Sequence, residues 1–318
     1  MQPRCCAFFG WPSPVIANGL GAADWIQRQN LPRAVISGVP YLLAIMSAVF
    51  YGAADFTGGV LTRRVSAVPV VLISQASGLV LVAVVLPLLP AAAPRTADLW
   101  WGAAAGLAGG VGVALLYHAL ATGTMSVVAP TTAVAAVAIP VIISVALGER
   151  PGSLTVVGIV LGIGSIALVS RQTRTTTEAA RSSGLGPALG SGVAIGLFLF
   201  ALAQSRPASG LWPLLMARFT SVALFAAVVA LRRRSLRMPV RLGVLAVVCG
   251  AIDMLANTLY LLAAQLGPLS PVVTLSSLYP ASTVLLARAV LGERLNAWQI
   301  AGVASALVAV VLIVRGGG

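Results

Sequence analysis

Ten stretches of predominantly apolar residues follow one another along the chain, separated by short polar or glycine-containing segments. They cover about residues 40–59, 68–89, 99–120, 125–146, 153–170, 187–204, 211–231, 240–265, 269–290 and 297–314. A helix of about 20 apolar residues can cross the hydrocarbon core of a bilayer. The apolar residues are continuous rather than alternating, which is unlike the strands of a transmembrane barrel. The pattern predicts an all-α membrane protein with ten transmembrane helices.

The ten stretches form two copies of one unit. When the chain is compared with itself at an offset of 144 residues, Leu147-Gly148-Glu149-Arg150 falls on Leu291-Gly292-Glu293-Arg294. Other identical pairs at this offset are Ser47 and Ser191, Gly52 and Gly196, Pro69 and Pro213, Ser77 and Ser221, Gly106 and Gly250, and Ala119 and Ala263. One constant offset along both halves indicates an internal duplication of a five-helix unit.

The two copies are predicted to be inverted, because five is an odd number of membrane crossings. The loop arginines support this inversion: Arg63 and Arg64 follow the first span and only Arg95 follows the second. In the second copy the bias reverses, since Arg206 alone follows the sixth span and five arginines follow the seventh. Positive loops favour the cytoplasm. The loops opposite the termini hold eleven arginines and the face of the termini holds seven, which places both termini outside the cytoplasm.

The composition agrees with a chain embedded in lipid. Hydrophobic residues make up 59% and charged residues only 8% of the 318 positions, whereas soluble domains carry about 25% charged residues. All 20 basic residues are arginines, and most lie between the apolar runs. That placement is typical of membrane topology rather than of nucleic-acid binding, so no nucleic-acid partner is expected. The three cysteines have no metal-ligand spacing, so no metal or cofactor is expected.

We expect four regions along the chain. Residues 1–39 form a poorly ordered N-terminal tail with several prolines, and residues 40–170 form the first repeat. A polar linker rich in threonine and arginine covers 171–186, and the second repeat covers 187–315.

Polar groups inside a bilayer are costly and indicate function by default. Asp253, Asn257 and Tyr260 are spaced i, i+4 and i+7 in the eighth run, which places them on one face of a helix. The equivalent residues of the first copy are Gly109, Val113 and Leu116, so the repeat itself does not require this face. We interpret it as the wall of a central cavity; hydrogen bonding between helices is the alternative.

A buried ion pair is predicted between Arg218 and Asp253. Both residues lie thirteen positions from the arginine-rich loop that joins the seventh and eighth runs. At a rise of 1.5 Å per residue, each side chain lies roughly 20 Å deep, near the bilayer midplane. A single charge there would be strongly destabilising, so the two should pair. The sequence leaves open whether the pair is structural or takes part in substrate or proton coupling.

Five further polar residues are candidates for the cavity: Asp55, Gln75, His118, Ser276 and Tyr279. For Asp55, a cavity role and pairing with the nearby Arg63 and Arg64 are equal alternatives. For His118, hydrogen-bonded packing near the interface is the favoured interpretation over titration during transport. Because the deep polar residues gather in the second copy, the site is expected to be asymmetric and centred on the seventh to ninth spans.

The repeated Leu-Gly-Glu-Arg near the end of the fourth helix of each copy, followed by a glycine-containing fifth helix, resembles the EamA domain of the drug/metabolite transporter superfamily. In the second copy, Arg218, Tyr260, Gly267 and Pro280 match its pattern, whereas in the first copy Ser74 replaces the arginine and Ala136 the proline. The resemblance covers about 40–315. It implies carriers of metabolites, amino acids or drugs that work by alternating access. It also implies that both termini lie in the cytoplasm, against the arginine tally, so the sequence leaves the orientation open.

We therefore expect a secondary transporter of a small molecule in the cell membrane, with a proton or an ion as a candidate coupling partner. A channel or a membrane-embedded enzyme is the alternative. The chain contains one histidine and neither an H-E-x-x-H nor a G-x-x-x-x-G-K-[ST] motif, which argues against an enzyme and against an ATP-driven pump. Inverted repeats favour alternating access over a channel.

Overall fold

The computed structural model describes residues 33–88, 93–146, 152–170, 184–233, 236–266, 278–293 and 297–316, together with 272, 275, 276 and 295. The described residues of the first repeat form α2 (Arg33–Thr62), α3 (Ala67–Val85), α4 (Thr96–Thr122), α5 (Met125–Ala146) and α6 (Ser153–Ser170). Those of the second form α7 (Leu185–Ala203), α8 (Trp212–Leu231), α9 (Val240–Leu266), α11 (Tyr279–Leu291) and α12 (Ala297–Gly316). Short 3-10 helices cover Leu86–Leu88 and Pro207–Ser209.

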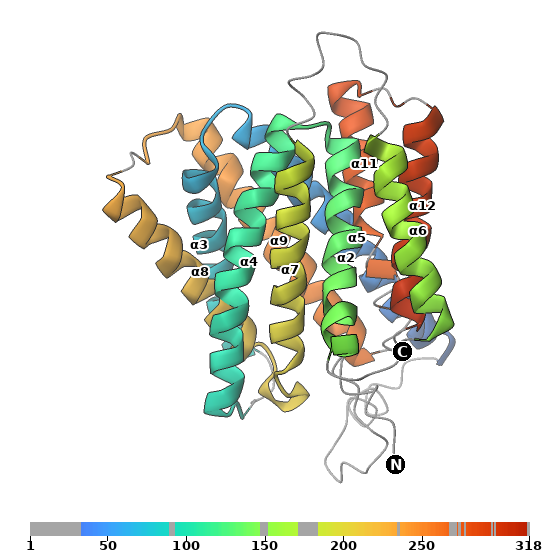
Figure 1. Ribbon diagram of the computed structural model, residues 1–318. Helices are drawn as coiled ribbons and strands as arrows, with labels where there is room; N and C mark the ends of the chain where they lie inside the picture. The colour runs from blue at the N-terminus through green and yellow to red at the C-terminus, as the bar shows by residue number, and fades with distance from the viewer. Residues whose placement is uncertain are drawn as a thin grey trace.

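The helices are consistent with an integral membrane protein. Six of them are long and apolar enough to cross a bilayer, and four shorter apolar stretches lie in α5, α6, α11 and α12. Large apolar side chains are exposed along the outside of the bundle, as lipid contact requires, and Trp100 and Trp298 are exposed at helix starts. The start of α2 and the end of α12 lie at the same end of the bundle (Figure 1), which we call the terminal face.

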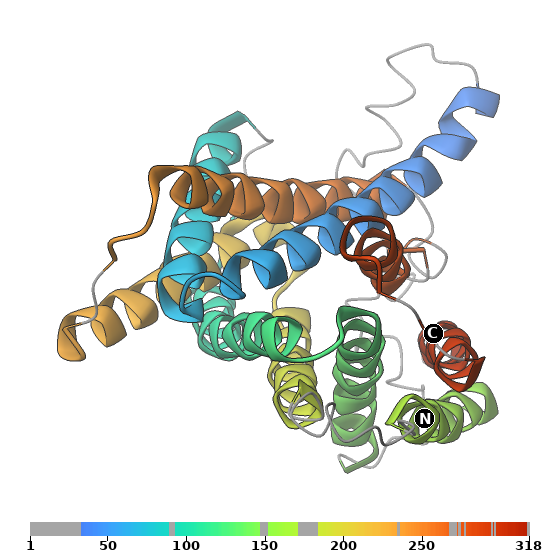
Figure 2. The same ribbon diagram turned by 90° about the horizontal axis from the view of Figure 1, so that it is seen from above.

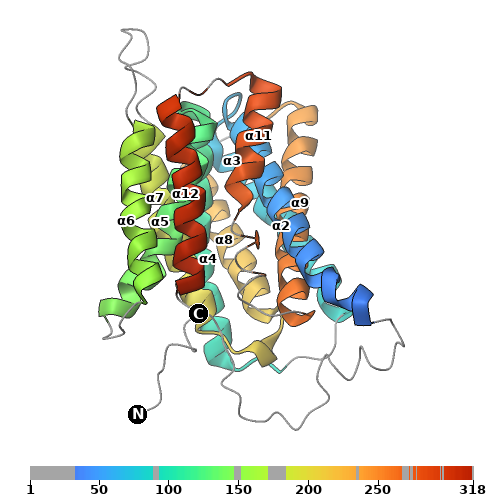
Figure 3. The ribbon, with the colours of Figure 1, turned by 90° about the vertical axis from the view of Figure 1, so that its right-hand side faces the viewer.

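Packing of the helices repeats the duplication seen in the sequence. Helix α2 packs on α9 as α7 packs on α4, and α6 and α12 pack against each other, forming a pair at one side of the bundle (Figures 2 and 3). The Ser47 hydroxyl donates to the Ala256 carbonyl, and the Ser191 hydroxyl donates to the Gly112 carbonyl, both at 2.8 Å. Donor and acceptor are each displaced by the same 144 residues, so the copies share a fold and a contact.

The ninth apolar run differs from the single helix expected over 269–290. Helix α11 begins only at Tyr279, with Leu278 as its N-cap and Pro280 in its first turn. Proline has no backbone N–H to donate to the preceding turn of a helix. Pro280 therefore accounts for the interruption of the helix before Tyr279. The first copy has Ala136 at the equivalent position, and α5 continues through it. Gly267 and the Leu147–Arg150 tetrapeptide lie outside the described residues.

Two pairs of neighbouring helices, α3 with α9 and α4 with α8, approach each other closely at glycine residues. A Cβ atom at Gly250 of α9 would overlap the backbone carbonyl of Ser74 on α3, and one at Gly106 of α4 would overlap the backbone carbonyl of Ala217 on α8. These two contacts are related by the repeat to within one residue. Small residues permit this type of contact between membrane helices.

We predict that Gly250→Ala lowers the free energy of unfolding by about 1–3 kcal/mol, because the added methyl group forces α9 away from α3. Gly164→Ala is the matched control, since a Cβ atom at Gly164 would have nothing within 4 Å. The control should be neutral or slightly stabilising because alanine favours helix. Unfolding of both variants in detergent, followed by circular dichroism, measures the difference. Equal stability of the two variants would contradict the prediction.

Candidate functional site

A small cavity lies between the two repeats, where α2, α3, α4, α8 and α9 meet. Its volume is about 20 Å³, which accommodates roughly one water molecule. The lining residues are Asp55, Ser74, Gln75, Val113, Tyr117, Arg218, Gly250 and Asp253. The cavity is polar although the helices around it are apolar, which makes it the candidate functional site.

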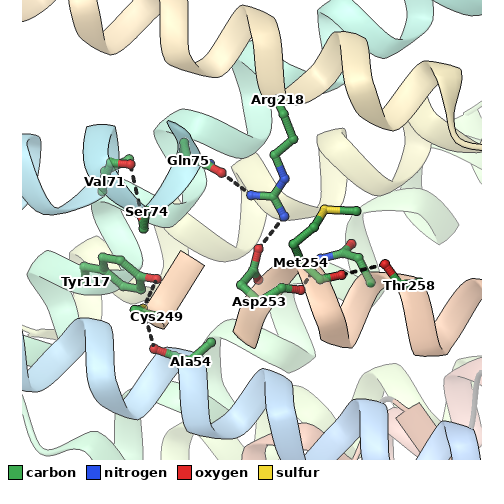
Figure 4. A network of polar contacts seen from close by, with 11 residues as sticks. Ala54, Val71, Ser74, Gln75, Tyr117, Arg218, Cys249, Asp253, Met254 and Thr258 are labelled. Atoms are coloured by element: carbon green, nitrogen blue, oxygen red, sulfur yellow. Dashed lines mark hydrogen bonds and ion pairs between the residues drawn. The ribbon is translucent and has the colours of Figure 1, made fainter. Parts of the chain in front are cut away.

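The predicted pairing of Arg218 and Asp253 is confirmed. The guanidinium of Arg218 extends from α8 between α3 and α9, where it donates to the Gln75 side-chain oxygen and to the Asp253 carboxylate (Figure 4). Arg218 is 9% exposed. A buried guanidinium requires such partners, because an unpaired charge in this environment would be strongly destabilising. The group holds three helices of both repeats together.

A second contact network fixes the side of the cavity formed by α2, α4 and α9. The Tyr117 hydroxyl and the Cys249 sulfur lie 3.3 Å apart, and the Cys249 thiol donates to the Ala54 carbonyl at 3.3 Å (Figure 4). All three residues are buried. A tyrosine ring from the first repeat is thereby held against the helix that carries Asp253.

Asp55 faces this cavity from α2. It makes no hydrogen bond or ion pair with any residue that the structure describes, whereas Arg63, its suggested alternative partner, pairs with Glu293. The cavity therefore brings together two carboxylates and one guanidinium. One turn before Asp55 on the same helix, the ring of Tyr51 contacts that of Tyr279, with ring centroids 6.1 Å apart at 61°.

Four of the nine residues expected in the cavity line it, namely Asp55, Gln75, Arg218 and Asp253. The remaining five lie elsewhere: Asn257 donates to the Asp253 carbonyl within its own helix, and Tyr260 packs against a buried cluster that includes Ala44 of α2. The Ser276 hydroxyl donates to the Ala44 carbonyl, and Tyr279 packs on Tyr51. His118 is exposed on the outside of α4.

The lining of this cavity is not concentrated in the second repeat. Five of the eight lining residues belong to the first repeat, and α11 contributes none. Sequence reasoning missed Ser74, Val113, Tyr117 and Gly250 as lining residues. Ser74 is the repeat equivalent of Arg218, so comparison at the 144-residue offset could have identified Ser74 as a lining residue. Within the described residues, no group of three histidine, cysteine or acidic side chains could hold a metal ion.

On the terminal face the two repeats are joined by a contact that we call the terminal clasp. Asp98 at the start of α4 accepts from the Arg206 side chain at 2.9 and 3.2 Å and from the Arg206 backbone at 3.1 Å. The same carboxylate accepts from the Arg95 backbone at 2.9 Å, and Asp98 is only 3% exposed. Charge-assisted bonds of this kind are stronger than neutral ones.

On the opposite face the two repeats are joined by a different contact, which we call the Glu293 clasp. The Glu293 carboxylate accepts from the Met125 and Ser126 backbone at 3.1 and 3.0 Å and from the Ser126 hydroxyl at 2.9 Å. It also lies 3.4 Å from Arg63. A carboxylate at a helix N-terminus satisfies free N–H groups and interacts favourably with the helix dipole. This glutamate, from the repeated tetrapeptide, caps α5 of the other repeat.

Comparison with known proteins gives a match to one family. The model of the EamA-like transporter family matches residues 38–171 and again residues 183–315. The two matches correspond to the two repeats and cover most of the chain. Comparison with the curated proteins found no match.

Proposed function

We propose, from the premise that this chain belongs to the EamA-like transporter family of the drug/metabolite transporter superfamily, that it carries a small molecule across the cell membrane by alternating access. In such a cycle the two repeats rock against each other and expose a central site to one face at a time. The residues that we assign to this site are Asp55, Gln75, Tyr117, Arg218 and Asp253, which line the cavity between the repeats.

One observation carries the proposal: the central cavity lies between two clasps that join the repeats on opposite faces. A cavity of about 20 Å³ has no room for a metabolite, so binding and release require conformations in which the helices separate. Opening toward the terminal face requires Arg206 to leave Asp98. Opening toward the other face requires Glu293 to leave the start of α5. The closed arrangement thus corresponds to an intermediate between the two open states.

The test is transport by the purified protein in proteoliposomes, with labelled amino acids, other metabolites and drug-like molecules as candidate substrates. A carrier is expected to show saturable uptake and to accelerate uptake when unlabelled substrate is present inside, because a loaded site returns through the same cycle. Empty vesicles and vesicles with heat-denatured protein are the controls. Flux that rises linearly with concentration and shows no such exchange would contradict a carrier and favour a channel. No transport of any candidate would favour another class.

A further inference from the structure

The charges that line the central cavity do not balance. Asp253 is paired with Arg218, and Asp55 has no hydrogen bond or ion pair with any described residue. If both carboxylates were ionised, the cavity would carry one net negative charge. A cation of some kind must therefore accompany Asp55 whenever the cavity is closed, or the carboxylate must be neutral.

The groups around Asp55 offer no second counterion. The titratable and charged side chains near it are Tyr51 on α2, Tyr117 on α4, Arg218 on α8, Cys249, Asp253 and Tyr260 on α9, and Tyr279 on α11. Helix α3 adds the neutral Ser74 and Gln75. Tyrosine and cysteine are neutral near pH 7, because their ordinary pKa values are about 10 and about 8.5. Arg218 is the one positive charge among them, and Asp253 of like charge faces Asp55.

Asp55 is partly buried, and withdrawal of an ionised carboxylate from water without a partner is so unfavourable that such a group normally becomes neutral instead. The cavity has room for about one water molecule, which cannot replace the hydration shell of an ion. A metal cation of the sodium or calcium type prefers several oxygen ligands, whereas the Gln75 oxygen and the Asp253 carboxylate already bind Arg218. A proton is the one cation that needs no further ligands or space.

We propose that Asp55 is the proton-binding group of this carrier. A carboxylate oxygen of Asp55 takes one proton from water when the cavity is open to one face, and only the neutral acid allows the cavity to close. After the cavity opens to the other face, the same O–H bond breaks and the proton returns to water there. One proton then crosses the membrane with each closing step. The Nε of Arg218, buried and without a hydrogen-bond partner in the described part of the chain, is a donor for a cavity water on this route.

Infrared spectroscopy of the reconstituted protein tests the protonation itself. At about pH 7 an ordinary aspartate or glutamate is ionised, so a carboxylic-acid carbonyl band at this pH reports an unusual group. We expect this band in the wild type, its loss in Asp55→Asn, and its retention in Glu178→Gln, which neutralises a carboxylate of the linker. A band of full intensity in Asp55→Asn, or no band in the wild type, would overturn the proposal.

A transport assay tests whether closing of the cavity depends on protonation of Asp55. Unlike the infrared measurement, this assay rests on the proposed carrier function. Uptake by the wild type and by Glu178→Gln should slow as the pH rises on both sides of the membrane, because every closing step needs the protonated acid. Asp55→Asn should lose this pH dependence and still equilibrate substrate, because its neutral amide lets the cavity close without a proton. The same pH dependence in Asp55→Asn as in the wild type, or uptake that requires sodium and does not respond to pH, would overturn the proposal. If no substrate is carried at all, the carrier function fails, while the infrared band still decides the role of Asp55.

Discussion

Replacement of Asp253 by alanine is expected to abolish transport and to lower the free energy of unfolding by about 3–5 kcal/mol. The variant leaves Arg218 as a buried cation without its carboxylate, and removal of one partner of a buried ion pair has an effect of this size. Gln75 still accepts from the guanidinium, but an amide oxygen supplies no charge. Unfolding in mixed detergent micelles measures the stability, and the proteoliposome assay measures transport.

The double variant Arg218→Met with Asp253→Leu separates the structural role of the pair from its role in the cycle. Apolar side chains of similar size often replace a buried ion pair without loss of stability. We therefore expect most of the lost stability to return in the double variant while transport remains absent. A double variant that is both stable and active would reduce the pair to a structural role. An Asp253→Ala variant as stable and as active as the wild type would contradict the whole assignment.

Much of the scaffold was predictable because lipid imposes simple requirements on a sequence. Lengths of apolar runs reflect bilayer thickness, and the constant offset of 144 residues reproduces the contacts of Ser47 and Ser191. Depth counted in residues along two neighbouring helices was sufficient to pair Arg218 with Asp253, because helix rise is uniform. The break before Tyr279 was not found, since hydropathy does not respond to a single proline.

Two physical causes place expected residues outside this cavity. Residues spaced i, i+4 and i+7 share a face, but that face passes from the cavity to other packing partners along its length: Asp253 lines the cavity, whereas Tyr260 packs against a cluster that includes Ala44 of α2. Asn257 satisfies its amide on its own backbone, an outcome available to short polar side chains in helices. Successive helical residues point about 100° apart, so the inward direction of Tyr117 turns His118 outward.

The two clasps could not be read from one sequence. The Asp98 carboxylate and the Arg206 guanidinium meet across 108 residues, and the Glu293 carboxylate reaches the backbone of Met125 across 168. Such pairs depend on how the repeats dock, which periodicity and hydropathy do not describe. In the sequence, loop arginines indicate topology, and Glu293 indicates a turn. The structure adds their contacts, which join the two repeats on opposite faces.

In the proposed cycle, the terminal clasp and the Glu293 clasp each control access to the same cavity from their own face. Ser74→Cys provides a reporter in the cavity wall, in a background where Cys5, Cys6 and Cys249 are replaced by serine. Arg315→Cys in the same background marks the terminal face in sealed vesicles, because Arg315 is exposed at the end of α12. Asp98→Asn weakens the terminal clasp and Glu293→Gln weakens the other.

The rate at which a membrane-impermeant maleimide labels residue 74 from each face tests this claim most directly. A charge-assisted hydrogen bond contributes about 1.5–3 kcal/mol, so loss of one clasp should shift the population at least about tenfold toward the state open on that side. We predict that Asp98→Asn accelerates labelling from the terminal face only and that Glu293→Gln accelerates it from the opposite face only. Acceleration from both faces by either variant, or from neither face by both, would contradict it.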